Sequence, residues 1–359
     1  MPWLLYGANG YTGELAAREA ARRGLSPVLA GRNAPAVAAL AAELGLPHRA
    51  FALDDPGAIR RGLDGVAAVL HCAGPFVRTS ARMVSVCLAT GVHYLDITGE
   101  IAVFEAVLAA RDAARRARVV LLPGAGFDVV PSDCLAARLA EALPGAVELV
   151  LAFYGEGAAM SRGTLKTMIE SFPHAGAVRR EGRIVPVPLA WDAREIPFAP
   201  GPRWAMTIPW GDVATAYHST GIPNIRVYSG APPKAIRRAR LARPLLPLLG
   251  LGPIKRLLQR RVERTVTGPG EKARARGRVH LWGEVRDAAG AAVTGTLETP
   301  EAYAFTAVSA VECAERVAAG RVEPGAWTPS QAFGWRFVTE LPGAVVGELS
   351  PAPRVGDGG

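Results

Sequence analysis

A glycine-rich turn close to the N-terminus carries the clearest chemical information in the sequence. Apolar residues 3–6 run into Gly7-Ala8-Asn9-Gly10-Tyr11-Thr12-Gly13, and a helix is predicted over residues 14–23. A strand, a glycine turn and a helix in this order direct backbone N–H groups and the positive end of the helix at a phosphate. Gly7 allows the tight turn, Gly10 permits close approach of the backbone, and Gly13 lets the helix pack on the strand. The pattern predicts a dinucleotide-binding loop.

The end of the second predicted strand indicates which dinucleotide would bind. Strand residues 27–30 are followed by Gly31-Arg32-Asn33. A site for NAD usually has a carboxylate at this point, which holds the 2′-hydroxyl of the ribose. A guanidinium instead pairs with a 2′-phosphate, which a carboxylate would repel. We therefore predict NADP as the cofactor, against the alternative that Arg32 is one more surface residue in an arginine-rich chain.

The alternation of apolar runs and helical patterns continues and predicts a fold. Further strands are expected at residues 49–53, 66–72, 93–97 and 119–122, and helices at residues 56–63, 80–90 and 101–116. Six short strands connected by helices are typical of an α/β fold with a Rossmann-type, doubly wound parallel sheet. Such a sheet binds its ligand at the carboxyl ends of the strands.

The pattern changes after residue 126, which predicts a second, mixed α/β domain. Longer strands are expected at residues 147–154, 278–285 and 293–299, and helices at residues 132–142, 164–171 and 304–319. We therefore expect an NADP-binding domain over residues 1–126, a substrate and dimerisation domain over 127–300, and a C-terminal helix and tail over 301–359. This last region is expected to return toward the first domain.

The turn after the fourth predicted strand should lie along the path of the cofactor toward its nicotinamide. It reads Cys72-Ala73-Gly74-Pro75-Phe76, in which Gly and Pro restrict the backbone. Together with the first two turns it completes the expected cofactor site. The predicted cofactor-binding residues are Gly7, Ala8, Asn9, Gly10, Tyr11, Thr12, Gly13, Gly31, Arg32, Asn33, Cys72, Ala73, Gly74, Pro75 and Phe76.

Three residues are predicted as catalytic candidates: Tyr94, Asp128 and His218. Hydride transfer requires a group that supplies a proton or a hydrogen bond to the developing charge. Tyr94 lies at a strand end, Asp128 follows the sixth strand, and His218 is placed in a loop of the second domain. Each has an ordinary alternative, namely a half-buried strand tyrosine, a helix-capping aspartate and a loop histidine that does not reach substrate.

These motifs together resemble the saccharopine dehydrogenase-like oxidoreductases, and within them the branch that contains trans-acting enoyl reductases. The resemblance is carried by the glycine turn, by Cys72-Ala73-Gly74-Pro75-Phe76, by Tyr94-Leu95-Asp96-Ile97-Thr98-Gly99-Glu100 and by Gly126-Phe127-Asp128-Val129-Val130-Pro131-Ser132-Asp133. It covers the first 135 residues well and is looser beyond them. It implies a Rossmann lobe, NADP, a mixed α/β substrate lobe and a homodimer, but it does not transfer a substrate.

Other classes of protein find no support in the sequence. No Gly-x-Ser-x-Gly elbow, His-Glu-x-x-His helix or P-loop lysine is present, and no tyrosine is followed four residues later by lysine. The four cysteines have neither metal-binding nor disulfide-framework spacing. No apolar run reaches the length of a spanning helix, and the N-terminus does not resemble a secretion signal. We expect a cytoplasmic protein without a metal site.

The net charge of +9 is concentrated in one segment. Residues 234–264 hold ten basic residues and a single acidic one, Glu263, which equals the whole excess. No nucleic-acid-binding motif accompanies the charge, so we expect no nucleic acid partner. Apolar residues between the arginine clusters leave two interpretations, a solvated helical excursion or dimer contact, and peripheral contact with a membrane. Prolines and glycines in the middle exclude one continuous helix.

The sequence therefore predicts an NADP-dependent oxidoreductase that moves a hydride between NADP(H) and a C=C, C=N or C=O bond of a small or lipid-derived substrate. The alternative is a non-catalytic NADP(H)-binding sensor or membrane-associated regulatory protein. It stays open because no acid–base residue stands out unambiguously.

Overall fold

The computed structural model describes residues 2–156, 160–171, 176–246 and 251–352. The chain folds into two compact units. The first unit comprises residues 1–130 and 303–333, and the second comprises residues 131–302 and 334–359. Of the predicted C-terminal helix and tail, residues 303–333 fall in the first unit and residues 334–359 in the second.

The first unit is built on a parallel sheet of seven strands in the described part of the chain. Its strands follow the order β15-β6-β5-β4-β1-β2-β3, and every neighbouring pair is parallel. The strands are β1 (Trp3–Tyr6), β2 (Val28–Gly31), β3 (His48–Ala50), β4 (Ala68–His71), β5 (His93–Asp96), β6 (Val120–Leu122) and β15 (Gly325–Ala326). Chain order reverses between β1 and β4, which confirms the predicted doubly wound sheet.

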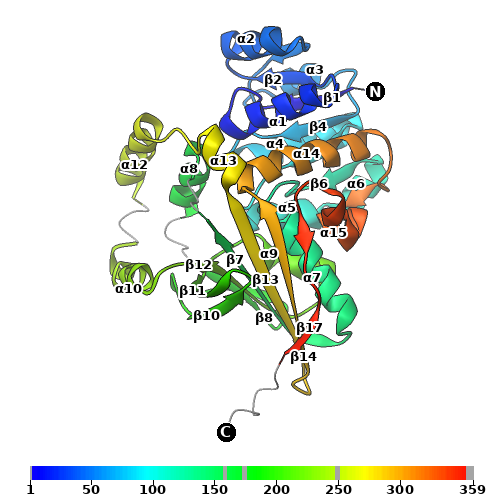
Figure 1. Ribbon diagram of the computed structural model, residues 1–359. Coiled ribbons are helices and arrows are strands. Elements are labelled where there is room, and N and C mark those ends of the chain that lie inside the picture. The colour runs from blue at the N-terminus through cyan, green and yellow to red at the C-terminus, as the bar shows by residue number, and fades with distance from the viewer. Residues whose placement is uncertain (1, 157–159, 172–175, 247–250, 353–359) are drawn as a thin grey trace. The chain divides into compact units, whose positions relative to one another are not determined.

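Helices alternate with most strands of this sheet along the chain (Figure 1). They are α1 (Tyr11–Arg22), α2 (Ala34–Leu44), α3 (Pro56–Gly62), α4 (Phe76–Thr90), α5 (Ile101–Ala109), α6 (Arg111–Ala117), α14 (Ala302–Ala318) and α15 (Pro329–Phe333). All residues of β1 and β4 are buried, as expected for parallel strands covered on both faces. The strands therefore form the core, and their carboxyl ends carry the turns that can meet a ligand.

Two details of the first unit differ from the sequence-based prediction. The single helix expected over residues 101–116 is two helices, because the backbone at Ala110 leaves helical geometry (φ −80°, ψ 10°). The sheet has a seventh strand, β15, from a distant part of the chain. The Arg111 side chain helps to hold it by donating from Nε to the Ala326 carbonyl at 2.9 Å. A two-residue strand that pairs with a distant partner leaves no periodic pattern to detect.

Helix α14 returns to the first unit although it comes from residues 302–318 (orange in Figure 1). Arg23, the C-cap residue of α1, forms an ion pair with Glu312 at 2.8 Å. The Ser309 hydroxyl donates to the Ala125 carbonyl at 2.9 Å, and the Thr306 hydroxyl accepts from the Phe127 N–H at 3.0 Å. The helix thus braces the turn that follows β6.

Within its described residues, the second unit contains a mixed sheet of ten strands, with the main order β10-β11-β12-β7-β13-β14-β16. Its strands are β7 (Ala146–Gly155), β8 (Ala177–Arg180), β9 (Arg183–Pro186), β10 (Ala193–Phe198), β11 (Gly201–Thr207), β12 (Asn224–Gly230), β13 (Arg278–Asp287), β14 (Ala292–Pro300), β16 (Val345–Val346) and β17 (Ser350–Ala352). Only the β7 and β12 pair is parallel among these described strands. The predicted mixed α/β domain is confirmed.

The helical elements of the second unit are α7 (Val130–Ala142), α8 (Arg162–Ser171), α9 (Asp212–Thr220), α10 (Pro233–Leu241), η1 (Arg243–Leu245), α12 (Gly252–Thr265), α13 (Glu271–Arg276) and η2 (Trp335–Glu340). The expectation of a loop around His218 is wrong, because this residue lies in the last turn of α9. The helix ends only at Gly221, which adopts the left-handed conformation (φ 72°) of a C-terminal cap.

The basic segment forms separate helices, as its prolines and glycines predict. Helix α10 and η1 precede residues 247–250, which lie outside the described residues, and α12 follows them. No helix in the described part of the chain combines the length and apolar character needed to cross a bilayer.

Candidate active site

The glycine turn between β1 and α1 forms a cradle that side chains would fill. Gly7 has a φ of +84°, which favours glycine, and its N–H donates to the Ala30 carbonyl at 2.7 Å. A Cβ at Gly13 would come within 2.1 Å of the Gly7 carbonyl oxygen. Gly10 donates its N–H back to Gly7 at 2.9 Å. The turn therefore keeps its shape only with glycine at positions 7 and 13.

The same turn leaves helix α1 open to an anion. Gly10 is the N-cap residue, and no side chain caps the helix there. The first N–H groups of a helix have no partner within it, and they form the positive end of the helix dipole. Asn9 is exposed and Tyr11 and Thr12 are partly exposed in this first turn, while Ala8 is buried. The Tyr11 ring is held edge-on against Tyr303 of α14, with centroids 5.0 Å apart.

The end of β2 adjoins the glycine turn and presents a cation. A Cβ at Gly31 would lie 2.9 Å from Oδ1 of Asn9, so glycine is needed for this close approach. Arg32 is exposed, and within the described residues no hydrogen bond or ion pair engages its guanidinium. Asn33 caps α2 by accepting the Ala36 N–H at 3.3 Å. The cradle and the exposed guanidinium fit the pyrophosphate and the 2′-phosphate of NADP.

The turn after β4 lies directly against the cradle. A Cβ on Gly7 would be 3.0 Å from both N and Cβ of Ala73. Cys72 donates its N–H to the Tyr6 carbonyl at 2.8 Å, and the Ala73 carbonyl accepts from the Thr79 hydroxyl at 2.9 Å. The peptide between Gly74 and Pro75 is cis. The first and third predicted cofactor segments therefore meet in one place.

Glu100 holds the far side of this turn. Its two carboxylate oxygens accept the backbone N–H groups of Phe76 and Val77, each at 2.8 Å. These donors belong to the first turn of α4, where a negative charge is favourable. Glu100 thus connects the end of β5 to the turn after β4.

Asp96 joins the ends of β5 and β6 and is completely buried. Its Oδ1 accepts the N–H groups of Thr98 at 3.0 Å and Gly124 at 2.9 Å, and its Oδ2 accepts the Tyr94 hydroxyl at 2.7 Å. Burial raises the pKa of Asp96 to about 6, although these hydrogen bonds act in the opposite direction. Burial and the nearby Asp96 charge raise the pKa of Tyr94 well above its ordinary value. Tyr94 is fully buried and directs its proton to Asp96.

Asp128 lies beyond β6 and is partly exposed. Its carboxylate sits against Gly99, where a Cβ would come within 2.5 Å of Oδ2. Burial raises the pKa of Asp128 to about 7, and the charge of Glu100 raises it further in the same direction. A carboxyl group of this kind holds its proton for a large part of the time near neutral pH.

The three catalytic candidates come from both units. Tyr94 and Asp128 belong to the first unit, whereas His218 belongs to α9 of the second unit. The role of Glu100 as a double backbone acceptor was not predicted, nor was the bracing of Phe127 by Thr306. Both depend on contacts between distant segments. The only indication in the sequence was that Glu100 follows a strand end.

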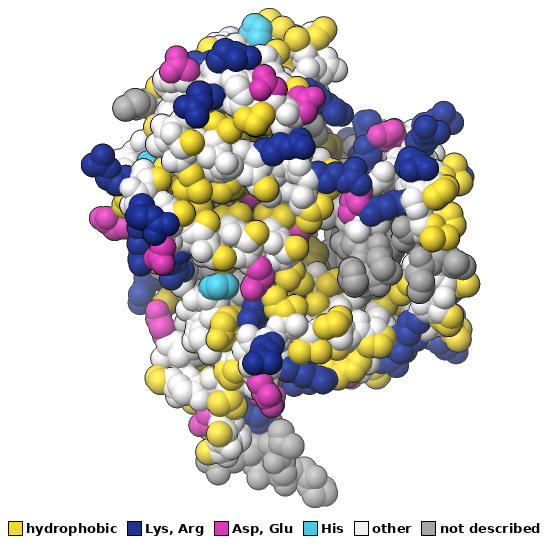
Figure 2. Space-filling model, turned by 180° about the vertical axis from the view of Figure 1, so that it is seen from behind, with side chains coloured by type: hydrophobic (Ala, Val, Ile, Leu, Met, Phe, Trp, Pro, Cys, Tyr) yellow, Lys and Arg dark blue, Asp and Glu magenta, His cyan; other side chains and the backbone are white. Residues whose placement is uncertain are grey.

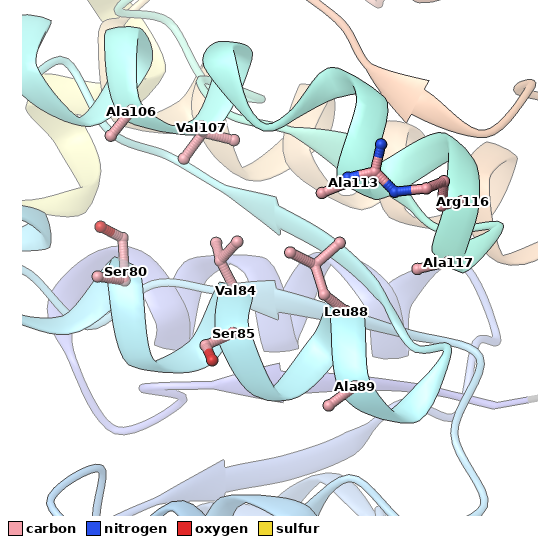
Figure 3. A pocket seen from close by; sticks show the side chains of 11 residues that line it. Ser80, Val84, Ser85, Leu88, Ala89, Ala106, Val107, Ala113, Arg116 and Ala117 are labelled. Carbon is pink, nitrogen blue, oxygen red and sulfur yellow. The ribbon is translucent and has the colours of Figure 1, made fainter.

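A groove of about 690 Å³ lies elsewhere in the first unit, among α4, α5 and α6. Figure 3 shows Val84 and Leu88 of α4 on the side that faces Val107 of α5 and Ala113 of α6. Its lining is mainly apolar, with Arg116 as its charged member. The groove does not include the turns at the strand ends, and its lining lacks a carboxyl group that could act as an acid or base.

Comparison with known proteins matches the first unit to a family. Residues 3–122 match the model of the saccharopine dehydrogenase NADP-binding domain. The chain is 26% identical over 214 residues to the human saccharopine dehydrogenase-like oxidoreductase, covering 52% of this chain and 50% of that protein. It is 32% identical over 183 residues to a putative trans-acting enoyl reductase of Mycobacterium tuberculosis, covering 46% and 43% of the two chains.

The fold extends beyond the matched domain. The structure of apo saccharopine dehydrogenase (L-Glu forming) from Saccharomyces cerevisiae superposes with a TM-score of 0.66 and 12% identity, covering 98% of this chain and all of that one. This similarity shows the fold alone. The matches to curated relatives span about a third to a half of the length of those proteins. The predicted family resemblance and the predicted NADP cofactor are confirmed for the first domain.

Proposed function

We propose that the protein is an NADP-dependent oxidoreductase, a proposal supported by the match of residues 3–122 to the saccharopine dehydrogenase NADP-binding domain. It transfers a hydride between NADP(H) and a C=C, C=N or C=O bond of a small or lipid-derived substrate. The trans-acting enoyl reductase and saccharopine dehydrogenase-like names of the relatives support this range of substrates without selecting one member.

One observation carries the proposal: Asp128 lies at the same sheet edge as the cofactor cradle, with a pKa raised to about 7. Ligands of doubly wound sheets lie across the carboxyl ends of the strands. A general acid is most effective when its pKa is close to the working pH. We assign to Asp128 the transfer of a proton to or from the substrate.

The other residues of the site bind the cofactor or keep the strand-end turns in position. The glycine turn and the N-terminus of α1 bind the pyrophosphate, and Arg32 binds the 2′-phosphate. Bound NADPH supplies the hydride. Glu100 orders the turn after β4, along which the nicotinamide half of the cofactor would lie. Tyr94 and Asp96 fasten the ends of β5 and β6, so Tyr94 acts in this proposal as a positioning residue.

The test measures cofactor binding and turnover separately. We expect NADPH to bind more tightly than NADH, and we expect at least one member of a panel of enoyl, imine and ketone compounds to be reduced. Asp128→Asn should retain NADPH binding and lose most of the turnover, on the order of a hundredfold or more. Asp112→Asn, at an exposed position of α6, serves as the control.

The rival function is a non-catalytic NADP(H) sensor. The observation that favours it is that Tyr94 is buried and paired with Asp96, which leaves Asp128 as the partly exposed member of the two first-unit candidates. NADPH binding without oxidation across the whole panel, with Asp128→Asn unchanged in every readout, would support the sensor and overturn the oxidoreductase.

A further inference from the structure

The helices of the basic segment expose leucines as well as arginines. Leu241 and Leu245, at the end of α10 and in η1, are 73% and 59% exposed, and Leu251 and Leu257, around the start of α12, are 52% and 68% exposed. Exposed arginines accompany them at positions 238, 256, 260, 261 and 264. We call these residues the arginine–leucine surface. Figure 2 shows dark blue and yellow side chains side by side at its right-hand margin, where α10 and α12 lie.

The less exposed side of α12 combines apolar and polar residues: Ile254, Leu258 and Val262 are partly buried, as are Lys255 and Gln259. Lys255 forms an ion pair with Glu170, and the Gln259 amide donates to the same carboxylate at 2.7 Å. Glu263, the one acidic residue of the segment, is already paired with Lys166 of α8 at 2.5 Å. Leu257 and several arginines of α12 are exposed to solvent.

The α10 end of the surface is also anchored by polar contacts. Arg240 donates from Nε to the Ala190 carbonyl at 3.1 Å, and Arg243 donates from Nε to the Leu189 carbonyl at 2.7 Å. Ile236 of α10 is buried. Because the acceptors are neutral carbonyl groups, these hydrogen bonds do not neutralise the positive charges of Arg240 and Arg243. Leu241 and Leu245 remain exposed above this attachment.

A hollow at α12 is lined by leucines and arginines. It measures about 440 Å³ and is lined by Leu257, Leu258, Arg260, Arg261, Arg264 and Thr265. Guanidinium groups pair with phosphate through parallel hydrogen bonds. Removing the neighbouring leucines from water is favourable when the same partner also offers them an apolar environment.

Charge and composition decide among the possible occupants. A second copy of this surface would set like charges against each other, which is unfavourable. A nucleic acid is bound mainly by basic residues together with aromatic side chains that stack on bases, and residues 234–264 contain no aromatic residue. An anionic bilayer offers phosphate groups above a hydrocarbon layer, which matches both components.

We propose that the arginine–leucine surface binds the face of a membrane that contains anionic phospholipids. The interaction is peripheral, since the leucines reach only into the boundary of headgroups and acyl chains. It does not depend on the proposed oxidoreductase function. A homodimer, if formed, would use another face of the protein.

The test is co-sedimentation of the full-length protein with vesicles of phosphatidylcholine alone or mixed with phosphatidylglycerol. We expect retention on the mixed vesicles, weakened by salt, and little retention on phosphatidylcholine. Arg260→Gln/Arg261→Gln/Arg264→Gln should reduce partition about a hundredfold, since each arginine near an anionic surface contributes about fivefold. Leu241→Ser/Leu257→Ser should reduce it by about tenfold or more.

Two matched controls remove the same groups elsewhere. Arg60→Gln/Arg61→Gln/Arg183→Gln removes three exposed positive charges, and Val345→Ser removes an exposed apolar side chain. Both should bind mixed vesicles like the parent protein. Circular dichroism and NADPH binding verify that each variant is folded.

Any of four results would overturn the proposal. The first is absence of retention on mixed vesicles, and the second is equal retention for the surface variants and their controls. The third is that an oligonucleotide is bound but vesicles are not. The fourth is that the surface variants change only self-association in sedimentation velocity. Loss of binding in both surface variants, with controls unaffected, supports it.

Discussion

Asp128 packs directly on Gly99, so closely that a Cβ at position 99 would come within 2.5 Å of the aspartate Oδ2. Gly99 is not in the left-handed region, so an alanine can adopt its backbone conformation. Gly99→Ala should therefore displace the Asp128 carboxyl group rather than unfold the turn. We expect a lower kcat, by about tenfold or more because proton transfer needs close positioning, and an unchanged Kd for NADPH. Gly270→Ala, where a Cβ meets open space, is the control.

Asp128 should also make the stability of the protein depend on pH. Its pKa is about 7 in the folded protein, against 3.8 for an ordinary aspartate. Between these values the folded state keeps a proton that the unfolded state loses, so the free energy of unfolding should fall as pH rises from about 4 to about 7. Asp128→Asn should reduce this fall by about 2 kcal/mol between pH 5 and 7. Urea denaturation at several pH values measures it. An unaltered slope in the variant would contradict the assignment.

Arg32 should determine the choice between the two nicotinamide dinucleotides. Arg32→Ala removes the exposed guanidinium at the end of β2, and with it the partner of the 2′-phosphate. We expect NADPH to bind about ten- to a hundredfold more weakly, the equivalent of one charge-assisted hydrogen-bonded contact, while NADH affinity stays the same. Fluorescence titration with both dinucleotides gives the two constants. Arg60→Ala, at an exposed site on α3, should leave both unchanged.

Glu100 should influence the protonation of Asp128 as well as the stability of the turn after β4. In Glu100→Gln one of the two acceptors for Phe76 and Val77 is lost, which should lower the free energy of unfolding by about 1 to 3 kcal/mol. Removal of the negative charge should also lower the pKa of Asp128 and shift the upper limb of the pH–rate profile downward.

A matched structural control separates these two effects of Glu100. Asp55 caps α3 in a similar way, since its carboxylate accepts the N–H groups of Gly57 and Ala58 at 2.8 and 3.0 Å. Asp55→Asn should reduce stability while leaving the pH–rate profile in place. If both variants move the profile equally, Glu100 acts only through the stability of the fold.

Tyr94→Phe tests whether this tyrosine positions Asp96 or donates to substrate. The substitution removes the 2.7 Å hydrogen bond and leaves a buried carboxylate with one donor fewer. We expect the free energy of unfolding to fall by about 1 to 3 kcal/mol and turnover to persist. Tyr6→Phe, which removes a 2.9 Å hydrogen bond to the Phe51 carbonyl, is the comparison. Loss of turnover in the folded Tyr94→Phe variant alone would restore Tyr94 as a proton donor.

Much of the first unit could be predicted because its information is local. The alternation of strands and helices, the glycine turn and the arginine after β2 depend on neighbours in the sequence, and the structure places them as expected. The strand β15 could not be predicted, since it is defined by pairing with the distant strand β6. Nothing in the structure explains why the helix breaks at Ala110. His218 was misplaced because residues 212–220 contain β-branched and small residues that form a helix only in their tertiary setting.

The sequence by itself determined the kind of cofactor, because phosphate recognition depends on backbone conformation, on the absence of Cβ atoms and on one nearby cation. The chemistry around that cofactor was decided only by the tertiary structure. Burial and the nearby charge of Glu100 set the proton affinity of Asp128, and the approach of the turn after β4 to the end of β5 gives Glu100 its two backbone contacts. The pKa of a side chain depends on its solvation and on its distance from other charges, and neither can be read from the spacing of residues along the chain.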